Sequence, residues 1–383
     1  MHLYIHVPFC KQACYYCDFH FSTNLGQREA MVEAICREVS LQQAYLRMPE
    51  DDHRKKVSLQ TVYFGGGTPS LLGEKDLDRI FDCIARHFQL GPGAEITLEA
   101  NPDDITADQL RIWRQFPINR LSIGIQSFDP AHLRYLHRAH TADQAEDSVR
   151  LAQRAGFDNL SVDLIYAIPA ADHAIWQADL EKAVGLEVPH LSSYCLTIEP
   201  RTVFGKWLST GKIKAVDEEF AVRQFEMLVA QLGGHGYEQY EIANFARPGR
   251  YARHNRSYWQ GQPYLGVGPS AHSFNGISRQ YNVANNARYC QSIAEDRVPC
   301  TVEILSEQDR VNEYVMTNLR TQWGCDTREI QRLHGVDVLA LHREYLENCR
   351  VRELLTVEES TIRLTVKGRL LADQIASDLF LVD

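Results

Sequence analysis

The stretch HVPFCKQACYYCDF, residues 6–19, places three cysteines within eight positions of one another. Cys10, Cys14 and Cys17 are separated by three and by two residues, and they follow Leu3 to Val7, a short run expected to form a β-strand. Three thiols in one loop directly after a strand can reach a single metal centre. This loop therefore decides how the rest of the chain is interpreted.

The spacing of the cysteines distinguishes between three candidate kinds of site: a zinc site, a thioredoxin-type redox pair and an iron–sulfur cluster. Zinc usually takes four ligands, often as two separated CxxC pairs, and the chain has no second pair with suitable spacing. A thioredoxin-type CxxC would leave Cys10 without a role. A [4Fe-4S] cluster normally takes four thiolates, so three cysteines leave one iron open to a small chelating ligand. The sequence predicts such a cluster on Cys10, Cys14 and Cys17.

Composition limits the class of protein. With 383 residues the chain suits one large α/β domain plus a smaller appendage. A formal net charge of -10 argues against a general nucleic-acid-binding face, so no nucleic-acid partner is expected. The remaining seven cysteines are isolated and are expected to be small buried apolar side chains; they are Cys36, Cys83, Cys195, Cys290, Cys300, Cys325 and Cys349.

The expected compartment is the cytoplasm. No run approaches the roughly 20 apolar residues that span a bilayer, and MHLYIHVPFC lacks the charged start and long apolar core of a signal peptide. Thiols stay reduced in that compartment, so a disulfide framework is not expected.

Short β-branched runs alternate with helical segments, which predicts parallel strands joined by helices. Six such units suit a partial (β/α)6 barrel, in which functional residues gather at the carboxyl ends of the strands. The expected strands are Leu3 to Val7, Thr61 to Phe64, Glu95 to Glu99, Arg120 to Gly124, Asn159 to Ile165 and His190 to Thr197. The expected helices are Arg28 to Leu46, Glu74 to His87, Thr106 to Gln115, Thr141 to Ala155 and His173 to Val184.

Three regions are predicted: a barrel core over 1–235, a segment over 236–300 and a C-terminal domain over 301–383. The middle segment is rich in Gly, Pro, Asn and aromatic residues as far as about residue 290, and it is expected to form packed loops. The last region suggests a mostly helical, winged-helix-like domain. Its acidic residues and lack of a basic recognition helix favour structural packing over DNA binding. Its expected elements are helices at Ser306 to Leu319, Thr327 to Leu333 and Val338 to Asn348, a hairpin around Leu354 to Leu364 and a helix from Val366 to Asp378.

A glycine run supplies the second motif. Gly65 to Pro69 reads GGGTP and follows the predicted strand TVYF, where backbone amides can approach a ligand that side chains would obstruct. Together with the CxxxCxxC loop, it resembles the radical S-adenosylmethionine superfamily. The resemblance implies that the amino and carboxylate groups of S-adenosylmethionine chelate the open iron. It also implies that an electron from the reduced cluster can cleave the sulfonium to a 5′-deoxyadenosyl radical, chemistry that the cofactor carries.

The resemblance also implies a set of residues around S-adenosylmethionine. One stretch departs from the superfamily pattern. The chain reads IYAIPA over 165–170 where the family commonly has IYGLPG, so Ala167 and Ala170 put the backbone freedom after Asp163 in doubt. The residues implied to line the S-adenosylmethionine pocket are Tyr4, Tyr16, Gly66, Gly67, Thr68, Glu99, Gln126, Arg138 and Asp163.

Within the superfamily nearly the whole chain resembles the group that contains oxygen-independent coproporphyrinogen III oxidase. The oxidases carry a further cysteine two residues after the triplet and a longer N-terminal arm, whereas this chain has Phe19 there and nine residues before Cys10. The stretch HNRSYW, His254 to Trp259, resembles the HNxxYW signature of the HemW heme chaperones, which the oxidases lack. The chain is therefore identified as a member of the HemW-type family.

This second resemblance implies heme as a cofactor. Histidine is a good axial ligand for heme iron, and Tyr258 and Trp259 offer flat faces to a porphyrin. His254 is the first candidate ligand and His272, in PSAHS, is the competing one.

An arginine recurs at every third residue around the signature, at Arg247, Arg250, Arg253 and Arg256. Arginine forms bidentate pairs with carboxylates, so two of the four, with Arg253 and Arg256 as the named pair, are hypothesised to hold the heme propionates. The alternative is a solvated basic loop.

The predicted function is that of a chaperone that carries heme to acceptor proteins, among them membrane-associated respiratory enzymes, with a separate electron donor for the cluster. The acceptors are implied by the family resemblance alone. The alternative is a radical enzyme that decarboxylates coproporphyrinogen III, and a homodimer is left open.

Overall fold

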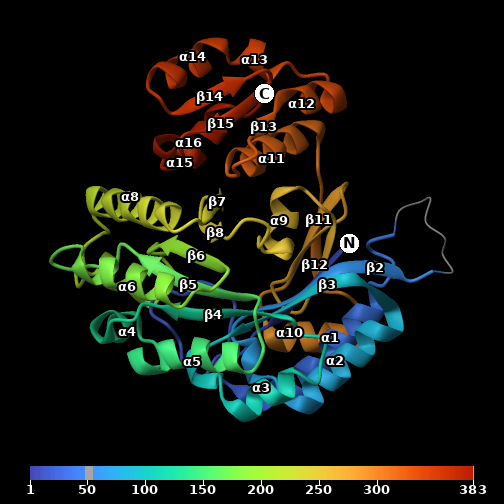
Figure 1. Cartoon of the computed structure of the whole chain (residues 1–383). Helices are drawn as coiled ribbons and strands as arrows, with labels where there is room; N and C mark the ends of the chain where they lie inside the picture. The colour runs from blue at the N-terminus through green and yellow to red at the C-terminus, as the bar shows by residue number, and fades with distance from the viewer. Residues whose placement is uncertain (48–54, 383) are drawn as a thin grey trace.

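The computed structural model describes residues 1–47 and 55–382, which fold into a curved sheet covered by helices and a smaller C-terminal part (Figure 1). Six strands run parallel and lie side by side in sequence order. This confirms the predicted partial barrel, and it brings the carboxyl ends of the six strands to one side. They are β1 (His2–Val7), β2 (Val57–Gly66), β3 (Phe88–Ala100), β4 (Arg120–Gln126), β5 (Leu160–Tyr166) and β6 (His190–Cys195).

The sheet continues beyond the six parallel strands at both edges. One further strand lies parallel to β1 and is followed by three antiparallel strands, while two short antiparallel strands extend the sheet beyond β6. The added strands are β9 (Tyr264–Val267), β10 (His272–Phe274), β11 (Ser278–Asn282) and β12 (Cys300–Ile304) at one edge and β8 (Asn244–Ala246) and β7 (Glu238–Glu241) at the other.

The expectation of packed loops between residues 235 and 290 is therefore wrong. The region contributes strands to both edges of the sheet and two helices, α9 (Arg253–Trp259) and α10 (Asn286–Ala294). Its strands have three to five residues, too few to show the alternation by which a strand is recognised. Strands from both sides of residue 235 share one sheet, and the predicted boundaries at 235 and 300 stay predictions.

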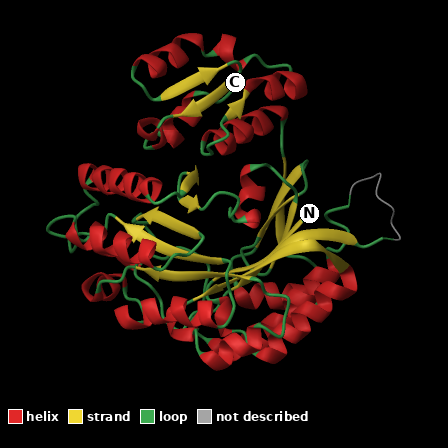
Figure 2. Cartoon of the chain, viewed as in Figure 1, coloured by secondary structure: helices red, strands yellow, loops and turns green. Residues whose placement is uncertain are grey.

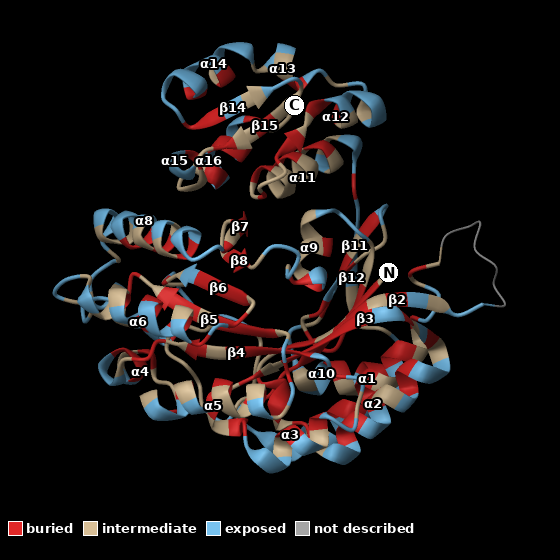
Figure 3. Cartoon of the chain, viewed as in Figure 1, coloured by how far each residue is buried: buried red, intermediate tan, exposed pale blue. Residues whose placement is uncertain are grey.

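Helices cover the outer face of the sheet (Figures 1 and 2), and the buried strands form the centre of the core (Figure 3). In α2 (Glu74–His87), Leu77, Ile80 and Ile84 form the buried stripe of an amphipathic helix, and Asp76 accepts a hydrogen bond from the Gly73 N–H. All five predicted helices are present. One of them, α2, has the predicted bounds, and the other four have shifted ends; α1, for example, ends at Leu41 rather than Leu46. The five helices are α1 (Arg28–Leu41), α2 (Glu74–His87), α3 (Ala107–Trp113), α5 (Ala142–Arg154) and α6 (Ala174–Gly185).

Three helices of this region were missing from the sequence-based expectation. Seven residues each make α4 (Pro130–Leu136) and α7 (Val203–Ser209) too short to show a clear apolar period. By contrast, α8 (Glu218–Gly234) buries Phe225, Leu228 and Leu232 at helical spacing, a pattern that could have indicated it.

The C-terminal part confirms the predicted mostly helical, winged-helix-like domain. A three-stranded antiparallel sheet and its helices enclose a separate apolar core. The expected helix at Val338 to Asn348 is divided at His342, and the expected last helix is divided after Arg369. No helix among the described residues combines the length and apolarity needed to cross a bilayer. The elements are α11 (Glu307–Leu319), β13 (Cys325–Asp326), α12 (Thr327–His334), α13 (Val338–Leu341), α14 (Arg343–Val351), β14 (Leu355–Glu358), β15 (Thr361–Leu364), α15 (Val366–Arg369) and α16 (Ala372–Asp378).

Candidate functional site

The cysteine loop leaves the carboxyl end of β1 and is closed at its base by two backbone hydrogen bonds. The Cys10 N–H donates to the Ser22 carbonyl over 3.0 Å, and the Ser22 N–H donates to the Pro8 carbonyl over 2.8 Å. Two side chains from other parts of the barrel reach the thiols. The Thr68 hydroxyl lies 3.4 Å from Cys10 Sγ, and Arg138 Nη1 lies 3.3 Å from Cys14 Sγ. The loop is thus tied to the strand ends that were predicted to surround it.

The positions of the three thiols are compatible with the predicted [4Fe-4S] cluster. All three are partly exposed, and no group of three His, Cys, Asp or Glu side chains among the described residues is arranged to hold one metal ion. In a [4Fe-4S] cluster each cysteine binds a different iron, so the sulfurs need not converge on one point. Burial raises the pKa of Cys10 to about 11 and that of Cys17 to about 12, so binding iron must displace these protons.

The glycine run after β2 is held against β1 and the start of the cysteine loop. Gly66 has a φ of +106°, a conformation that only glycine adopts without strain, and a Cβ there would lie 2.6 Å from the His6 ring. The Gly67 N–H donates to the Val7 carbonyl over 2.9 Å. A methyl group at either position would therefore push the end of β2 away from β1 and the cysteine loop.

Two of the predicted carboxylates lie inside the barrel on β3 and β5. Glu99 accepts a hydrogen bond of 2.6 Å from the Tyr63 hydroxyl. Asp163 accepts hydrogen bonds of about 3.3 Å from the hydroxyls of Ser122 and Ser161. Burial, followed by the negative charge of the nearby Asp163, raises the pKa of Glu99 to about 7. Burial likewise raises the pKa of Asp163.

Arg138 connects the cysteine loop to the ends of β3 and β4. Its Nη2 donates to the Asn101 side chain over 2.6 Å and to the Gly124 carbonyl over 2.7 Å. Asn101 in turn donates to the Thr68 hydroxyl over 3.2 Å. Gln126, with a φ of 70°, ends β4 beside these groups. Asn101 was not predicted, although its place in ITLEANP directly after a strand end is a signal that could have identified it.

Replacing Glu99 by glutamine is expected to stabilise the cofactor-free protein above neutral pH. The folded-state pKa of about 7 lies above the ordinary value of 4.5, so wild-type stability is lost as the pH rises through 7. The full shift corresponds to about 3 kcal/mol, and the partial exposure of Glu99 reduces this to about 1–2 kcal/mol. Urea unfolding at pH 8 should show Glu99→Gln as the more stable protein, with no difference near pH 4.5. Exposed Glu33→Gln is the control, and a difference independent of pH would contradict the assignment.

The motif helix α9 places His254 inside the barrel rather than on an open surface. The side chain is 1% exposed, with Nδ1 2.5 Å from the Thr61 hydroxyl and Nε2 2.8 Å from the Tyr258 hydroxyl. Its ring stacks on the Tyr63 ring with centroids 4.9 Å apart, and its backbone N–H donates to the Glu95 carboxylate. Burial holds the pKa of His254 well below its usual value. A heme iron at either nitrogen would have to displace Thr61 or Tyr258, so ligation by His254 stays a prediction.

The last two residues of the motif, Tyr258 and Trp259, line a large cavity. It has a volume of about 1240 Å³ and lies where β1 and β9 to β11 face α11 and α12 of the C-terminal part. Asp18, Phe19 and His20, directly after Cys17, form part of its wall. Phe19 is 72% exposed at this wall. The aromatic lining residues are Tyr4, Phe19, Tyr258, Trp259, Tyr264, Phe274 and Tyr314, and the histidines are His6, His20, His272 and His334.

The structure does not bring the four predicted arginines to this cavity. Arg253 donates to the Gly93 carbonyl over 2.6 Å, and the Arg256 guanidinium lies over the Trp323 ring at 4.8 Å. Arg247 and Arg250 donate to the carbonyls of His235 and Asp158. Each contacts a different part of the chain, and the partner of Arg256 belongs to the C-terminal part, so regular spacing in the sequence does not make the four arginines neighbours. The arginines that line the cavity, Arg279 and Arg310, were not predicted.

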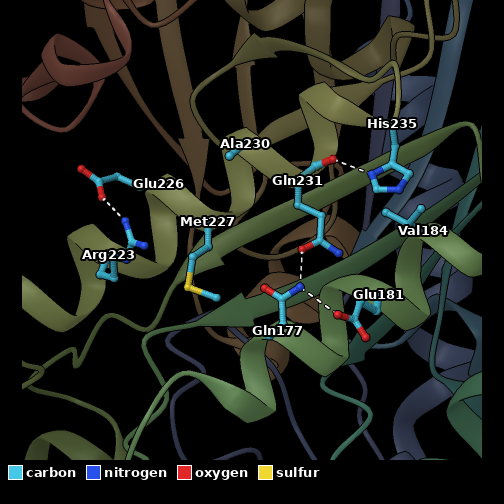
Figure 4. Close-up of a pocket in the computed structure, with 9 residues that line it drawn as sticks. All are labelled: Gln177, Glu181, Val184, Arg223, Glu226, Met227, Ala230, Gln231 and His235. Carbon is cyan, nitrogen blue, oxygen red and sulfur yellow. Dashed lines mark hydrogen bonds and ion pairs between the residues drawn. The ribbon is translucent and has the colours of Figure 1, made fainter.

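A second depression lies between α6 and α8, away from all predicted site residues (Figure 4). The Gln177 amide crosses it and donates to Gln231 and Glu181, both over 2.9 Å. The polar groups drawn there already pair with one another, and the depression is not a candidate for the predicted chemistry.

Comparison with known proteins agrees with this arrangement. The radical SAM superfamily profile matches residues 4–180, and the HemN C-terminal domain profile matches residues 305–371. Among solved structures, coproporphyrinogen III oxidase (HemN) from Escherichia coli superposes with a TM-score of 0.83 at 24% identity, covering 99% of this chain and 89% of that one. This likeness shows the fold.

The curated relatives are more specific. The chain is 31% identical to the heme chaperone HemW of Bacillus subtilis over 376 residues, 97% of each chain. It is 33% identical to the heme chaperone HemW of Mycobacterium tuberculosis over 382 residues, 98% of this chain and 94% of the relative. The chain therefore belongs to the heme chaperone HemW family of the radical SAM superfamily.

Proposed function

We propose that this protein is a heme chaperone that binds heme together with a [4Fe-4S] cluster and S-adenosylmethionine, and that it transfers the heme to acceptor proteins such as respiratory enzymes. The observation that carries the proposal is the aromatic cavity. It joins Tyr258 and Trp259 of the HNxxYW motif to residues 18–20, directly after the last cluster cysteine. The acceptors, the electron donor and the cytoplasmic location rest on the family and on the sequence.

The cofactor site has the donors that the superfamily's cofactors need. Cys10, Cys14 and Cys17 would hold three irons, and the glycine run and Glu99 would receive S-adenosylmethionine. When bound, the reduced cluster supplies an electron that can cleave the sulfonium. Thr68 and Arg138 hydrogen-bond to the cysteine sulfurs, and such bonds tune the reduction potential of a cluster.

The cavity has the chemistry that heme requires. A porphyrin is flat and apolar, its iron binds neutral imidazole, and its two propionates need cationic or hydrogen-bonding partners. Aromatic rings, four histidines and two arginines line this one cavity. Trp259 Nε1 is, in addition, a buried donor with no acceptor among residues 1–47 and 55–382. Such a donor inside a cavity is available to a bound polar group.

The test is anaerobic reconstitution followed by three assays: hemin titration, heme transfer to an apo-cytochrome, and turnover of coproporphyrinogen III with release of 5′-deoxyadenosine. Heme binding and transfer without decarboxylation are expected for a chaperone. Decarboxylation of coproporphyrinogen III would instead show that the protein is an oxidase, and failure to retain hemin would contradict the proposal.

Replacing Trp259 by alanine is expected to weaken hemin binding about tenfold, because a lost aromatic contact is worth roughly 1–1.5 kcal/mol. The matched control is Trp323→Ala, which removes an indole that does not line the cavity. Hemin titrations of the two variants, followed by heme absorbance, provide the comparison. Equal losses in both variants would mean that the cavity does not hold heme.

A further inference from the structure

The histidines near the cavity differ in what their ring nitrogens already bind. Both nitrogens of His254 have partners, and so do those of His6, which contacts the Tyr4 hydroxyl and the His20 carbonyl. His20 uses Nε2 on Asn286, and His334 uses Nδ1 on Glu307. No hydrogen bond to the His272 ring occurs within the described parts of the chain. Of these five, His272 alone keeps both nitrogens available to a metal.

The hairpin formed by β10 and β11 presents His272 in a fixed setting. His272 pairs with Tyr281 across the two strands, and Phe274 pairs with Arg279. Alternate residues of a strand share a face, so an imidazole, two aromatic rings and a guanidinium lie on one side of the hairpin. The His272 ring stacks on Tyr281 with centroids 5.5 Å apart. This packing limits the directions in which the imidazole can point.

The imidazole of His272 is also open to a ligand. A neutral imidazole has the nitrogen lone pair that iron accepts. His272 is exposed and lines the cavity, and neither of its ring nitrogens is hydrogen-bonded within the described residues, so no internal hydrogen bond has to break before a ligand approaches.

Arg279 lies on the same face of the hairpin as His272 and has one N–H donor without a partner among the described residues. Its Nη2 pairs with Glu313 of α11 over 3.0 Å, while its Nε is buried and has no acceptor within residues 1–47 and 55–382. Its guanidinium carbon lies 5.8 Å from the centre of the Phe274 ring. A heme carboxylate beside Phe274 could accept from this free donor and compete with Glu313.

We infer that His272 is an axial ligand of the heme iron and that Arg279 pairs with one heme propionate, in the cavity between the barrel and the C-terminal domain. The inference rests on the proposed heme-carrying function. It differs from the assignment based on the motif alone, in which His254 is the ligand and Arg253 and Arg256 hold the propionates. In the structure, Tyr258 and Trp259 line the porphyrin cavity, while His254 holds α9 in the barrel.

The axial-ligand assignment is tested by replacing the imidazole of His272 with a side chain that cannot bind iron and with one that binds it through sulfur. Hemin is added to wild type, His272→Ala and His272→Cys, and its absorption, resonance Raman and electron paramagnetic resonance spectra are recorded. We expect a histidine-ligated spectrum in wild type, its loss in His272→Ala and a thiolate-type spectrum in His272→Cys. Hemin affinity should fall roughly tenfold or more in His272→Ala, in line with the loss of a metal-site interaction. Iron-free protoporphyrin IX should bind wild type and His272→Ala equally.

The contact between Arg279 and a heme propionate is tested with hemin dimethyl ester, in which the carboxylate charges of the propionates are absent. Arg279→Gln should weaken hemin binding several-fold and leave the affinity for hemin dimethyl ester unchanged, whereas Arg253→Gln should affect neither ligand. Thermal unfolding of the heme-free variants checks that each still folds.

The outcomes separate the two proposals. If wild type binds no hemin, the proposed function fails. If wild type binds hemin but the His272 variants keep its spectrum and affinity, or if His20→Ala alone removes the histidine signature, the function stands and the ligand assignment is overturned. Equal responses of hemin and its dimethyl ester to Arg279→Gln would overturn the propionate contact.

Discussion

Replacing Cys17 by serine is expected to abolish the iron–sulfur cluster while the chain still folds. Cys17 lies in a loop and belongs to none of the apolar cores, so the change removes little packing. A serine hydroxyl is far harder to deprotonate than a thiol and is a poor ligand for iron, which leaves two cysteines for a cluster that needs three. Iron and sulfide analysis after anaerobic reconstitution should give about four irons per wild-type chain and almost none in the variant.

The matched control is Cys195→Ser, a partly exposed cysteine at the end of β6. It should retain wild-type iron content, and full iron content in Cys17→Ser would show that another residue completes the site. Binding of S-adenosylmethionine should fall with the iron content, because its chelating groups need the open iron. Hemin affinity of the same variant shows whether the sites communicate, since residues 18–20 belong to both the cysteine loop and the cavity wall.

The positions of the cysteine loop and of the glycine run, each at the carboxyl end of a strand, could be predicted because their signals are local in the sequence. Ligand spacing and the position of a loop after a strand are both readable from a short stretch of sequence. The parallel order of six strands then placed Glu99 and Gln126 at neighbouring strand ends without knowledge of any contact. Asp163 also lies on the barrel interior, although it occupies the middle of β5 rather than its end.

The setting of the HNxxYW motif could not be predicted in the same way. His254 contacts Thr61 on β2 and Glu95 on β3, residues that lie more than 150 positions away in the sequence. Whether a histidine faces a ligand or fills a core depends on such distant partners. The cavity could not be predicted for the same reason, because β1, the β10–β11 hairpin and α11 each supply only part of its wall.

The places of the four regularly spaced arginines could not be predicted from the sequence either. A period of three residues suggests one surface, yet only Arg253 and Arg256 belong to α9, and Arg247 and Arg250 precede it in a turn. Arg279 gives no periodic signal. The role proposed for it rests on the register that places it opposite Phe274 and beside the cavity.

Replacing Gly67 by alanine is expected to disturb the cluster site through the backbone. A Cβ at this position would lie 2.6 Å from the Phe9 carbonyl oxygen, 2.8 Å from the Phe9 nitrogen and 2.9 Å from the Val7 carbonyl oxygen. These atoms belong to the end of β1 and to the residue before Cys10, so they cannot move aside as a flexible side chain would. Overpacking of this kind costs about 1–3 kcal/mol, and the upper part of that range is expected because backbone must shift.

The matched control is Gly233→Ala in the last turn of α8, where a Cβ would meet nothing within 4 Å. Alanine there should leave stability unchanged or raise it by up to about 1 kcal/mol, since it favours the helix. Thermal unfolding of the cofactor-free proteins should therefore shift down for Gly67→Ala and stay level or rise for Gly233→Ala. Iron content after reconstitution is the second measurement, and it should fall only in Gly67→Ala, because the clash is transmitted to Cys10 through Phe9. A Gly67→Ala protein that melts and binds iron like wild type would mean that the close approach of β2 to the cysteine loop is not required for the cluster site.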